Sequence, residues 1–125
     1  MAERQAHYPY QAPIDAYGEG GFRFADMSHR GSILCLPSGV YGWDVGSADA
    51  LAVEAFARVF ADKDRIDVLL LGTGRTQVFP TLEIRNAFSA AGLGLEPMDT
   101  GAACRTYNVL LAEHRRVAAA LIAVD

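Results

Sequence analysis

The segment from Ile66 to Leu71 constrains the fold most strongly, because it is nearly continuous in apolar residues. A half-exposed strand alternates apolar and polar residues, whereas a strand without that alternation is usually covered on both faces. The run ends at Gly72-Thr73-Gly74, whose glycines let the chain leave a sheet. We therefore expect residues 66–71 to form the central strand of a sheet with other elements packed on both sides.

Clusters of glycine and proline predict two hairpins ahead of this strand. Residues 14–24 place apolar segments on both sides of the glycine-rich stretch Gly18 to Gly21, and glycine supplies the positive φ that a tight reversal needs. Residues 32–43 repeat the arrangement around Pro37-Ser38-Gly39, where proline presets one turn dihedral and glycine permits another. Both segments are predicted to be β-hairpins.

Three segments carry apolar residues at helical spacing. The first begins at Ser47, a residue type that caps the N–H groups of a first turn. The second spans residues 80–92, opens with Pro-Thr and closes with glycine. The third runs from Asp99 or Thr100 to about Glu113.

Two further strands complete the pattern. Residues 93–98 contain Pro97, which cannot donate to a ladder, so this strand lies at a sheet edge or ends there. Residues 117–124 are apolar, although the run Ala118-Ala119-Ala120 favours a helix. The element order predicts an α/β fold of α+β character, with a mixed β-sheet, N-terminal hairpins and about three helices packed on the sheet.

The length and composition fit one domain. The chain has 125 residues, 51% of them hydrophobic, which is enough for a real core and too short for two. Residues 1–13 mix prolines and tyrosines with polar residues and are expected to form an extended N-terminal arm. Residues 14–125 then form the single α/β domain.

Charge and cysteine usage exclude several classes of protein. The net charge is -4 and Arg115-Arg116 is the only adjacent basic pair, so we expect no nucleic-acid partner. Cys35 and Cys104 form neither a CxxC pair nor a disulfide framework, which favours a reducing compartment. The N-terminus has no apolar stretch of the kind a signal peptide needs, so the expected location is cytoplasmic.

A first candidate site is the loop Gly72-Thr73-Gly74. It follows a buried strand and precedes a helix, where free backbone N–H groups can hold an anion. It matches neither nucleotide-binding motif, because Gln77 takes the third glycine position of GxGxxG and no GK[ST] follows. The alternative is that the glycines only let the chain leave the sheet.

A second candidate is the polar start of the third helix. A ligand there would meet Thr100, Gly101, Arg105 and Asn108. Asp99 already supplies the negative charge that a helix N-terminus favours. Capping and packing are therefore the competing interpretation.

No catalytic or metal-binding arrangement is visible in the sequence. His7, His29 and His114 are scattered without metal-ligand spacing, and no cofactor is predicted. Cys104 lies near the start of a helix, where the helix dipole lowers a thiol pKa, but no histidine or second cysteine adjoins it. An inert buried thiol is the favoured interpretation, and Cys104 stays only a candidate ligand contact.

The aromatic residues Phe22, Phe24, Tyr41 and Trp43 gather in the two predicted hairpins. Aromatic side chains fit a half-buried pleated surface, and they also form exposed recognition patches. Core packing is the favoured interpretation. An exposed Trp43 would indicate partner binding instead.

Several segments, in their order and spacing, resemble one known family. They are Gly31-Ser32-Ile33-Leu34, Trp43, Leu69 to Gly74, Met98-Asp99-Thr100, Ala103 to Leu110 and Arg115 to Leu121. The resemblance spans roughly Ile14 to Val124 and points to the family that includes mitochondrial respiratory complex I assembly factor 3. None of these segments is a catalytic signature.

The resemblance implies a single mixed α/β domain and, for the mitochondrial member, a part in assembling a membrane-embedded respiratory complex. It implies no enzymatic activity and no cofactor. The positions that match the family are Gly72, Gly74, Thr100, Cys104, Arg105 and Asn108, which are either ligand contacts or fold residues. The start of this chain is neither arginine-rich nor amphipathic, unlike a mitochondrial presequence, so we expect a bacterial, cytoplasmic relative.

Two functional hypotheses follow. The first is a non-enzymatic binding protein that assists assembly of complex I-type machinery, with respiratory complex subunits or membrane-insertion machinery as partners and peripheral membrane association. The second is a small-molecule or anion-binding protein, with weak enzymatic activity at most, whose site lies between the Gly72–Gly74 loop and the Thr100 helix start. A partner-binding module should expose an apolar patch, whereas a ligand binder should have a pocket with converging polar groups. A function on a surface that the sequence does not reveal is the third alternative.

Overall fold

The predicted buried strand lies inside a five-stranded sheet. The structure is a computed structural model that describes residues 7–125. In it, β6 (Val68–Gly72) pairs in parallel with β7 (Gly94–Met98) on one side and with β8 (Val117–Leu121) on the other. The sheet order is β5-β4-β8-β6-β7, so β8 takes the middle position expected for β6. The three leucines of β6 are at most 2% exposed, which confirms that both faces of this strand are covered.

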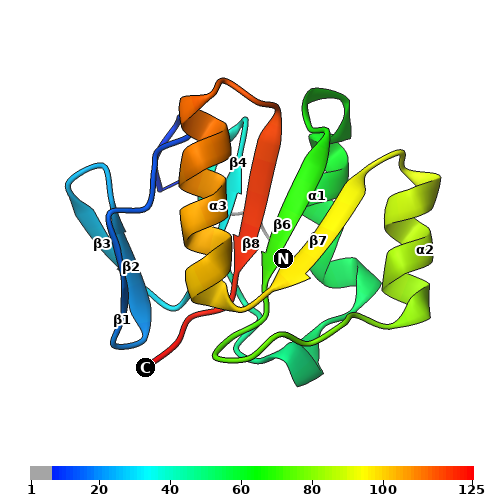
Figure 1. Cartoon of the computed structure of the whole chain (residues 1–125), viewed down its shortest axis with the longest axis horizontal. Helices are drawn as coiled ribbons and strands as arrows, with labels where there is room; N and C mark the ends of the chain where they lie inside the picture. Colours follow the sequence, from blue (N-terminus) through cyan, green and yellow to red (C-terminus); the bar gives the residue numbers. More distant parts are fainter. Residues whose placement is uncertain (1–6) are drawn as a thin grey trace.

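Both predicted hairpins are confirmed. β1 (Ala16–Gly18) and β2 (Gly21–Phe24) pair antiparallel, and β3 (Met27–Arg30) adds a third antiparallel strand to form a separate small sheet. β4 (Ser32–Leu36) and β5 (Gly39–Trp43) form the second hairpin. β4 also pairs antiparallel with β8, which makes the five-stranded sheet mixed (Figure 1).

Strand β3 was not expected from the sequence. The turn that leads into it contains Ala25 and Asp26 with φ of 49° and 61°. Such two-residue turns usually carry Asn-Gly or Asp-Gly, because both central residues need positive φ. The usual hairpin signal is therefore absent, and the strand itself is largely polar.

The second and third predicted helices are also confirmed. They are α2 (Leu82–Ala90) and α3 (Thr100–Ala112). The side chains of Thr81 and Asp99 accept hydrogen bonds from backbone N–H groups in the first turns. These caps satisfy donors that have no partner within the helix.

The helix expected to begin at Ser47 starts later and is short. The chain instead forms the 3₁₀ turns η1 (Ala48–Ala50) and η2 (Val53–Phe56), the short helix α1 (Ala57–Ala61) and the 3₁₀ turn η3 (Lys63–Arg65). The side chain of Ser47 makes no cap hydrogen bond, and Ala52 is extended with φ of -149°. The Trp43 indole donates to the Ala55 carbonyl oxygen at 2.8 Å, so the sheet holds this turn in place.

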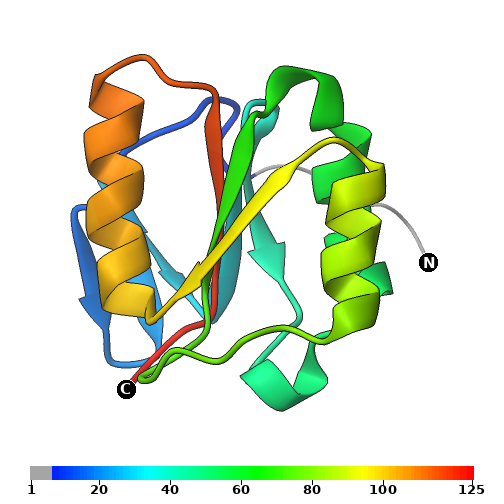
Figure 2. The ribbon, with the colours of Figure 1, turned by 45° about the vertical axis from the view of Figure 1, so that its right-hand side comes forward.

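The elements form layers on both faces of the five-stranded sheet. Figure 2 shows α1 and α2 on one face, with α3 and the small β1–β3 sheet on the other. The crossovers β6-α2-β7 and β7-α3-β8 run in opposite directions across the sheet. Right-handed crossovers of opposite direction place their helices on opposite faces. Within the described residues, no helix combines the length and the apolar character needed to cross a bilayer.

The strand β8 is confirmed although its alanine run favours a helix. Ala118, Ala119 and Ala120 are fully buried between the two layers. Pairing with β4 and β6 supplies ladder hydrogen bonds on both sides, and tertiary pairing of this kind overrides a weak local propensity. Small side chains also let both layers approach the sheet closely.

Residues 1–6 of the predicted N-terminal arm lie outside the described residues. In the remaining segment, the His7 N–H donates to the Val40 carbonyl oxygen at 2.8 Å, and the Val40 N–H donates to the Tyr8 carbonyl oxygen at 2.9 Å. The Gln11 side-chain amide donates to the Val117 carbonyl oxygen at 2.8 Å. These contacts hold residues 7–13 against the five-stranded sheet.

Candidate functional site

The two predicted loops meet at the carboxyl end of the parallel strands, and Thr100 joins them. Its hydroxyl donates to the Ile122 carbonyl oxygen at 2.7 Å and accepts from the Gly74 N–H at 3.0 Å. Its own N–H donates to the Gly74 carbonyl oxygen at 2.8 Å. Open α/β sheets commonly bind ligands at this edge. Here the fully buried Thr100 occupies the space between the strand ends.

Gly72 makes room for this arrangement. A Cβ atom at Gly72 would stand 3.1 Å from Thr100 Cα, from Thr100 Oγ1 and from Leu121 Cδ2. Contacts this close force neighbouring atoms to move in a packed interior. Gly72 therefore has a packing reason to be glycine, independent of any ligand.

The loop after β6 is held in one conformation by Thr73. The Thr73 hydroxyl donates to the Thr76 carbonyl oxygen at 2.6 Å and accepts from the Val78 N–H at 3.0 Å. The Gln77 amide donates to the Pro97 carbonyl oxygen at 2.9 Å. These hydrogen bonds tie the loop to itself and to the edge strand β7.

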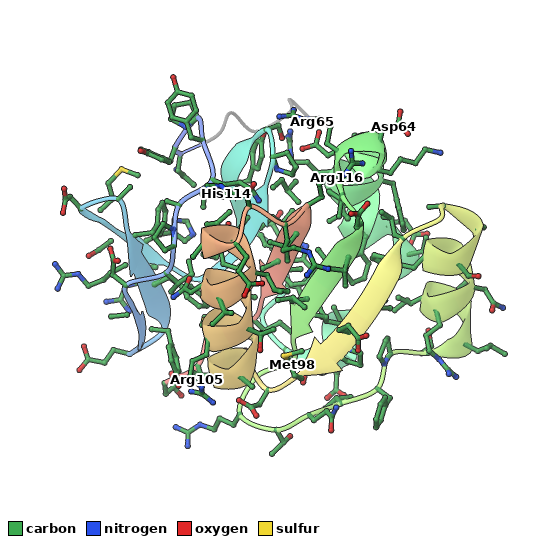
Figure 3. The ribbon with its side chains drawn as sticks, turned by 45° about the horizontal axis from the view of Figure 1, so that its top comes forward. Asp64, Arg65, Met98, Arg105, His114 and Arg116 are labelled. Atoms are coloured by element: carbon green, nitrogen blue, oxygen red, sulfur yellow. The ribbon has the colours of Figure 1, made fainter. Side chains whose placement is uncertain are left out.

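The first turn of α3 is covered by Tyr17 from β1. A Cβ atom at Gly101 would collide with the Tyr17 hydroxyl and would stand 3.3 Å from Arg105 Nη1. The Tyr17 phenol and the Arg105 guanidinium group therefore both pack against Gly101. Figure 3 shows Arg105 and Met98 at this end of the sheet, with His114 and Arg116 at the opposite end.

Asn108 and Cys104 lie away from the loops. The Asn108 amide accepts from the Ile14 N–H and donates to the Ile14 carbonyl oxygen, both at 2.8 Å. Cys104 is 3% exposed, and burial raises the pKa of its thiol to about 12, against the lowering effect of Arg105. A thiol with such a pKa carries almost no thiolate at neutral pH.

The structure therefore brings together only part of the predicted set. Gly72, Thr73, Gly74, Thr100 and Gly101 adjoin one another, and the exposed Arg105 lies at their rim. The hydrogen-bonding groups of Thr73, Gly74 and Thr100 are engaged within the protein. Among residues 7–125, no group of three metal-ligating side chains gathers in one place.

An exposed apolar surface that was not predicted from the sequence lies just beyond this loop. The side chains of Val78, Phe79 and Leu82 are 38%, 72% and 61% exposed, and we call them the Val78–Leu82 surface. A signal was present, because Leu82 falls outside the buried stripe of α2 that contains Ile84 and Phe88. Exposed apolar residues that gather in this way often mark a binding surface.

The hairpin aromatics, in contrast, belong to the core. Trp43, Tyr41, Phe22 and Phe24 are all buried. The favoured core interpretation is thus confirmed, and an aromatic recognition patch on the hairpins is excluded for these side chains.

A family model described as a protein of unknown function (DUF498/DUF598) matches residues 14–122. The chain belongs to this family. An uncharacterized protein of Rhodobacter capsulatus is 38% identical over 122 residues, covering 98% of this chain and 93% of that protein.

The mouse protein named NADH dehydrogenase (ubiquinone) 1 alpha subcomplex assembly factor 3 is 32% identical over 118 residues. The match covers 94% of this chain but 64% of the mouse protein. These relatives confirm the family resemblance found in the sequence, and the chain spans less than two thirds of the mouse relative's length.

A solved structure shows the same fold. The crystal structure of a protein described as an outer membrane protein from Bartonella henselae superposes with a TM-score of 0.92 at 53% identity. The match covers 95% of this chain and 100% of that chain. The mixed sheet with its two covering layers is therefore a feature of both proteins.

Proposed function

We propose that the chain is a non-enzymatic binding protein that assists assembly of complex I-type respiratory machinery. The mouse relative is named as an assembly factor of NADH dehydrogenase, which supports this function for the family domain. The observation that carries the proposal is the Val78–Leu82 surface. We propose a cytoplasmic location with peripheral association at the membrane.

The Val78–Leu82 surface suits binding because it is presented rigidly. Thr73 and Gln77 hold the loop by hydrogen bonds, and Pro80 is buried beneath it. A preformed apolar protrusion loses little conformational entropy when a partner covers it. Phe79, the most exposed of the three side chains, is the expected anchor.

Two arginines define the chemistry of the partner. Arg75 lies in the same loop, and Arg85 follows Leu82 by one helical turn in α2. Both are exposed. We infer a partner surface with an apolar groove and acidic residues at its rim, on a respiratory complex subunit or on membrane-insertion machinery.

The ligand-binding alternative has less support in the geometry. Of the groups predicted for it, Thr73, Gly74, Thr100 and Asn108 are engaged in hydrogen bonds within the chain. Arg105 beside Tyr17 and Gly101 is the exposed group that a ligand would still meet. A site between the Gly72–Gly74 loop and the Thr100 helix start therefore depends on Arg105.

Affinity purification from native cells tests the proposal. Tagged wild-type chain is compared with the double variant Phe79→Ser/Leu82→Ser and with Val109→Ser, which removes a 57% exposed apolar side chain from α3 on the other face. We expect complex I subunits or insertion machinery to co-purify with the wild type and with Val109→Ser, and to be lost from the double variant. Equal recovery of such a partner by all three chains would contradict the role of the Val78–Leu82 surface. Recovery of the wild-type chain alone would contradict the assembly function.

A further inference from the structure

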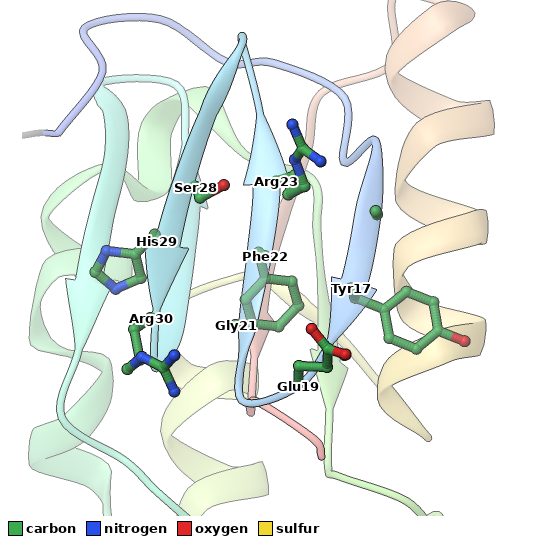
Figure 4. Close-up of a pocket in the computed structure, with 10 residues that line it drawn as sticks. Tyr17, Glu19, Gly21, Phe22, Arg23, Ser28, His29 and Arg30 are labelled. Carbon is green, nitrogen blue, oxygen red and sulfur yellow. The ribbon is translucent and has the colours of Figure 1, made fainter.

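A pocket of about 670 Å³ lies over the small β1–β3 sheet (Figure 4), and its residue Tyr17 also contacts Gly101 at the start of α3. Its lining comes from all three strands and from the turn between β1 and β2. Neither the family assignment nor the proposed assembly function gives it a role. Its composition nevertheless points to a ligand class.

The side chains of β2 alternate between the two faces of this sheet. Phe22 and Phe24 are buried against the domain, whereas Arg23 is exposed. Alternation of this kind follows from the pleat of a strand. The register pairs Arg23 with Ser28 and Gly21 with Arg30, so these four residues share the outer, solvent-facing side.

The middle of the outer face has almost no side-chain bulk. Ala16 pairs with Arg23, and Gly18 pairs with Gly21, so the β1 side of the face carries only a methyl group and hydrogen. This absence of bulk makes the face concave. The backbone therefore forms part of the floor of the pocket, whose lining also includes Tyr17, Phe22 and His29.

Two arginines stand at diagonal positions on this face. Arg23 and Arg30 lie on neighbouring strands two residues out of register, a placement that separates Cα atoms by about 7–8 Å. Arg30 Nη1 lies over the β1–β2 turn, 3.7 Å from where a Cβ atom of Gly20 would stand. Figure 4 shows Arg23 beside Ser28 toward one end of the pocket and Arg30 toward the other. Within the described part of the chain, no hydrogen bond or ion pair engages the guanidinium group of either arginine.

We propose that this pocket binds a small molecule through a diphosphate group, with one phosphate at Arg23 and the other at Arg30. Two exposed like charges on one sheet face repel each other until an anion lies between them. Guanidinium groups bind phosphate oxygens in bidentate geometry, and the Ser28 hydroxyl adds a further donor beside Arg23. A single carboxylate would occupy only one arginine, whereas a diphosphate spans both. The pocket volume leaves room for an organic group attached to the diphosphate.

Glu19 supplies an internal check on this assignment. It lines the same pocket from the β1–β2 turn, and its carboxylate repels an anion bound at Arg30. Removing that charge while keeping the shape, as in Glu19→Gln, should therefore tighten binding. A site that recognised cations would respond in the opposite direction.

Titration of the full chain with inorganic pyrophosphate and with orthophosphate, followed by backbone amide NMR at constant ionic strength, tests the proposal. We expect saturable shifts confined to residues 16–30 and pyrophosphate binding at least about tenfold tighter than orthophosphate binding. Arg23→Gln and Arg30→Gln should each remove this preference, and Glu19→Gln should strengthen pyrophosphate binding. Arg115→Gln, which removes the same charge from the exposed loop between α3 and β8, should change nothing.

Three results would overturn the assignment. One is the absence of saturable binding to the wild-type chain, and another is an undiminished pyrophosphate preference in Arg23→Gln and Arg30→Gln. The third is a set of shifts centred on Gly101 and Arg105, which would place the anion at the α3 helix start instead. The partner-binding function is unaffected by any of them, because the Val78–Leu82 surface lies on a different part of the molecule.

Discussion

The hydroxyl group of Thr100 lies 2.7 Å from the carbonyl oxygen of Ile122 and donates a hydrogen bond to it. The Thr100 hydroxyl oxygen also accepts from the Gly74 N–H, so one side chain joins the segments that follow β6, β7 and β8. The group is fully buried. This relationship gives Thr100 and Gly72 a structural role at this edge of the sheet without any need for a ligand.

Replacing Thr100 should show how much the fold depends on this junction. Thr100→Val leaves the carbonyl of the buried Ile122 and the partly buried Gly74 N–H without a partner, which should lower the free energy of unfolding by about 2–4 kcal/mol. Thr100→Ser keeps the hydroxyl and should cost roughly 1 kcal/mol for the lost methyl group. Urea denaturation of the three chains measures both. Similar losses in the two variants would mean that the hydroxyl does not hold the junction.

The helices α2 and α3 end in the same motif with different residues. Gly92 follows α2 with φ of 74°, and His114 follows α3 with φ of 60°. In both cases the next residue donates back to the helix, Leu93 to Phe88 and Arg115 to Leu110, each at 3.0 Å. This is the Schellman arrangement, in which glycine is favoured because other residues are strained at positive φ.

The helix ends therefore predict opposite effects of two substitutions. His114→Gly should raise the free energy of unfolding by about 0.5–1 kcal/mol, and Gly92→Ala should lower it by about 1 kcal/mol. Chemical denaturation of both variants checks the signs. A destabilised His114→Gly variant would show that the imidazole makes a compensating contact at the end of α3.

The buried thiols predict loss of stability in alkali. Burial raises the pKa of Cys104 to about 12 and also raises the pKa of Cys35. An unfolded chain releases these protons near pH 8.5, whereas the folded chain keeps them, so the free energy of unfolding falls as pH rises from about 8.5 toward 12. At pH 10 the expected loss is about 2 kcal/mol for each thiol.

Denaturation midpoints at pH 7 and pH 10 measure this effect. The double variant Cys35→Ala/Cys104→Ala should be less stable at pH 7 but should show a flatter decline. Iodoacetamide should label neither thiol in the folded chain and both in denaturant. Rapid labelling of folded Cys104 would contradict its description as a buried, unreactive thiol.

Much of the fold was predictable because local and tertiary signals agree in particular segments. The continuous apolar run that became β6 required two covering layers, and Thr81 and Asp99 marked the starts of α2 and α3. The helix expected to begin at Ser47 starts only at Ala57, because Ala52 adopts an extended backbone although the apolar spacing matches a helix. Sequence spacing alone does not reveal that the Trp43 indole donates a hydrogen bond to the Ala55 carbonyl oxygen.

The candidate site was harder to predict than the fold. The polar residues around Gly74 and Thr100 were visible in the sequence, but their hydrogen bonds to each other depend on loops that only the folded sheet brings together. The exposure of Phe79 and the pairing of Arg23 with the unexpected strand β3 are likewise tertiary facts. The one local hint that Phe79 is exposed was its position beside Pro80, outside the apolar stripe of α2.

The most direct test of the assembly function is the amount of assembled complex I in cells that lack the chromosomal copy of this chain. Native gel electrophoresis of membranes should show less complex I in the deletion strain, and full recovery with the wild-type chain or with Val109→Ser. The double variant Phe79→Ser/Leu82→Ser should accumulate to the same level yet fail to restore the complex. Unchanged complex I in the deletion strain, or complete restoration by the double variant, would contradict assembly through the Val78–Leu82 surface.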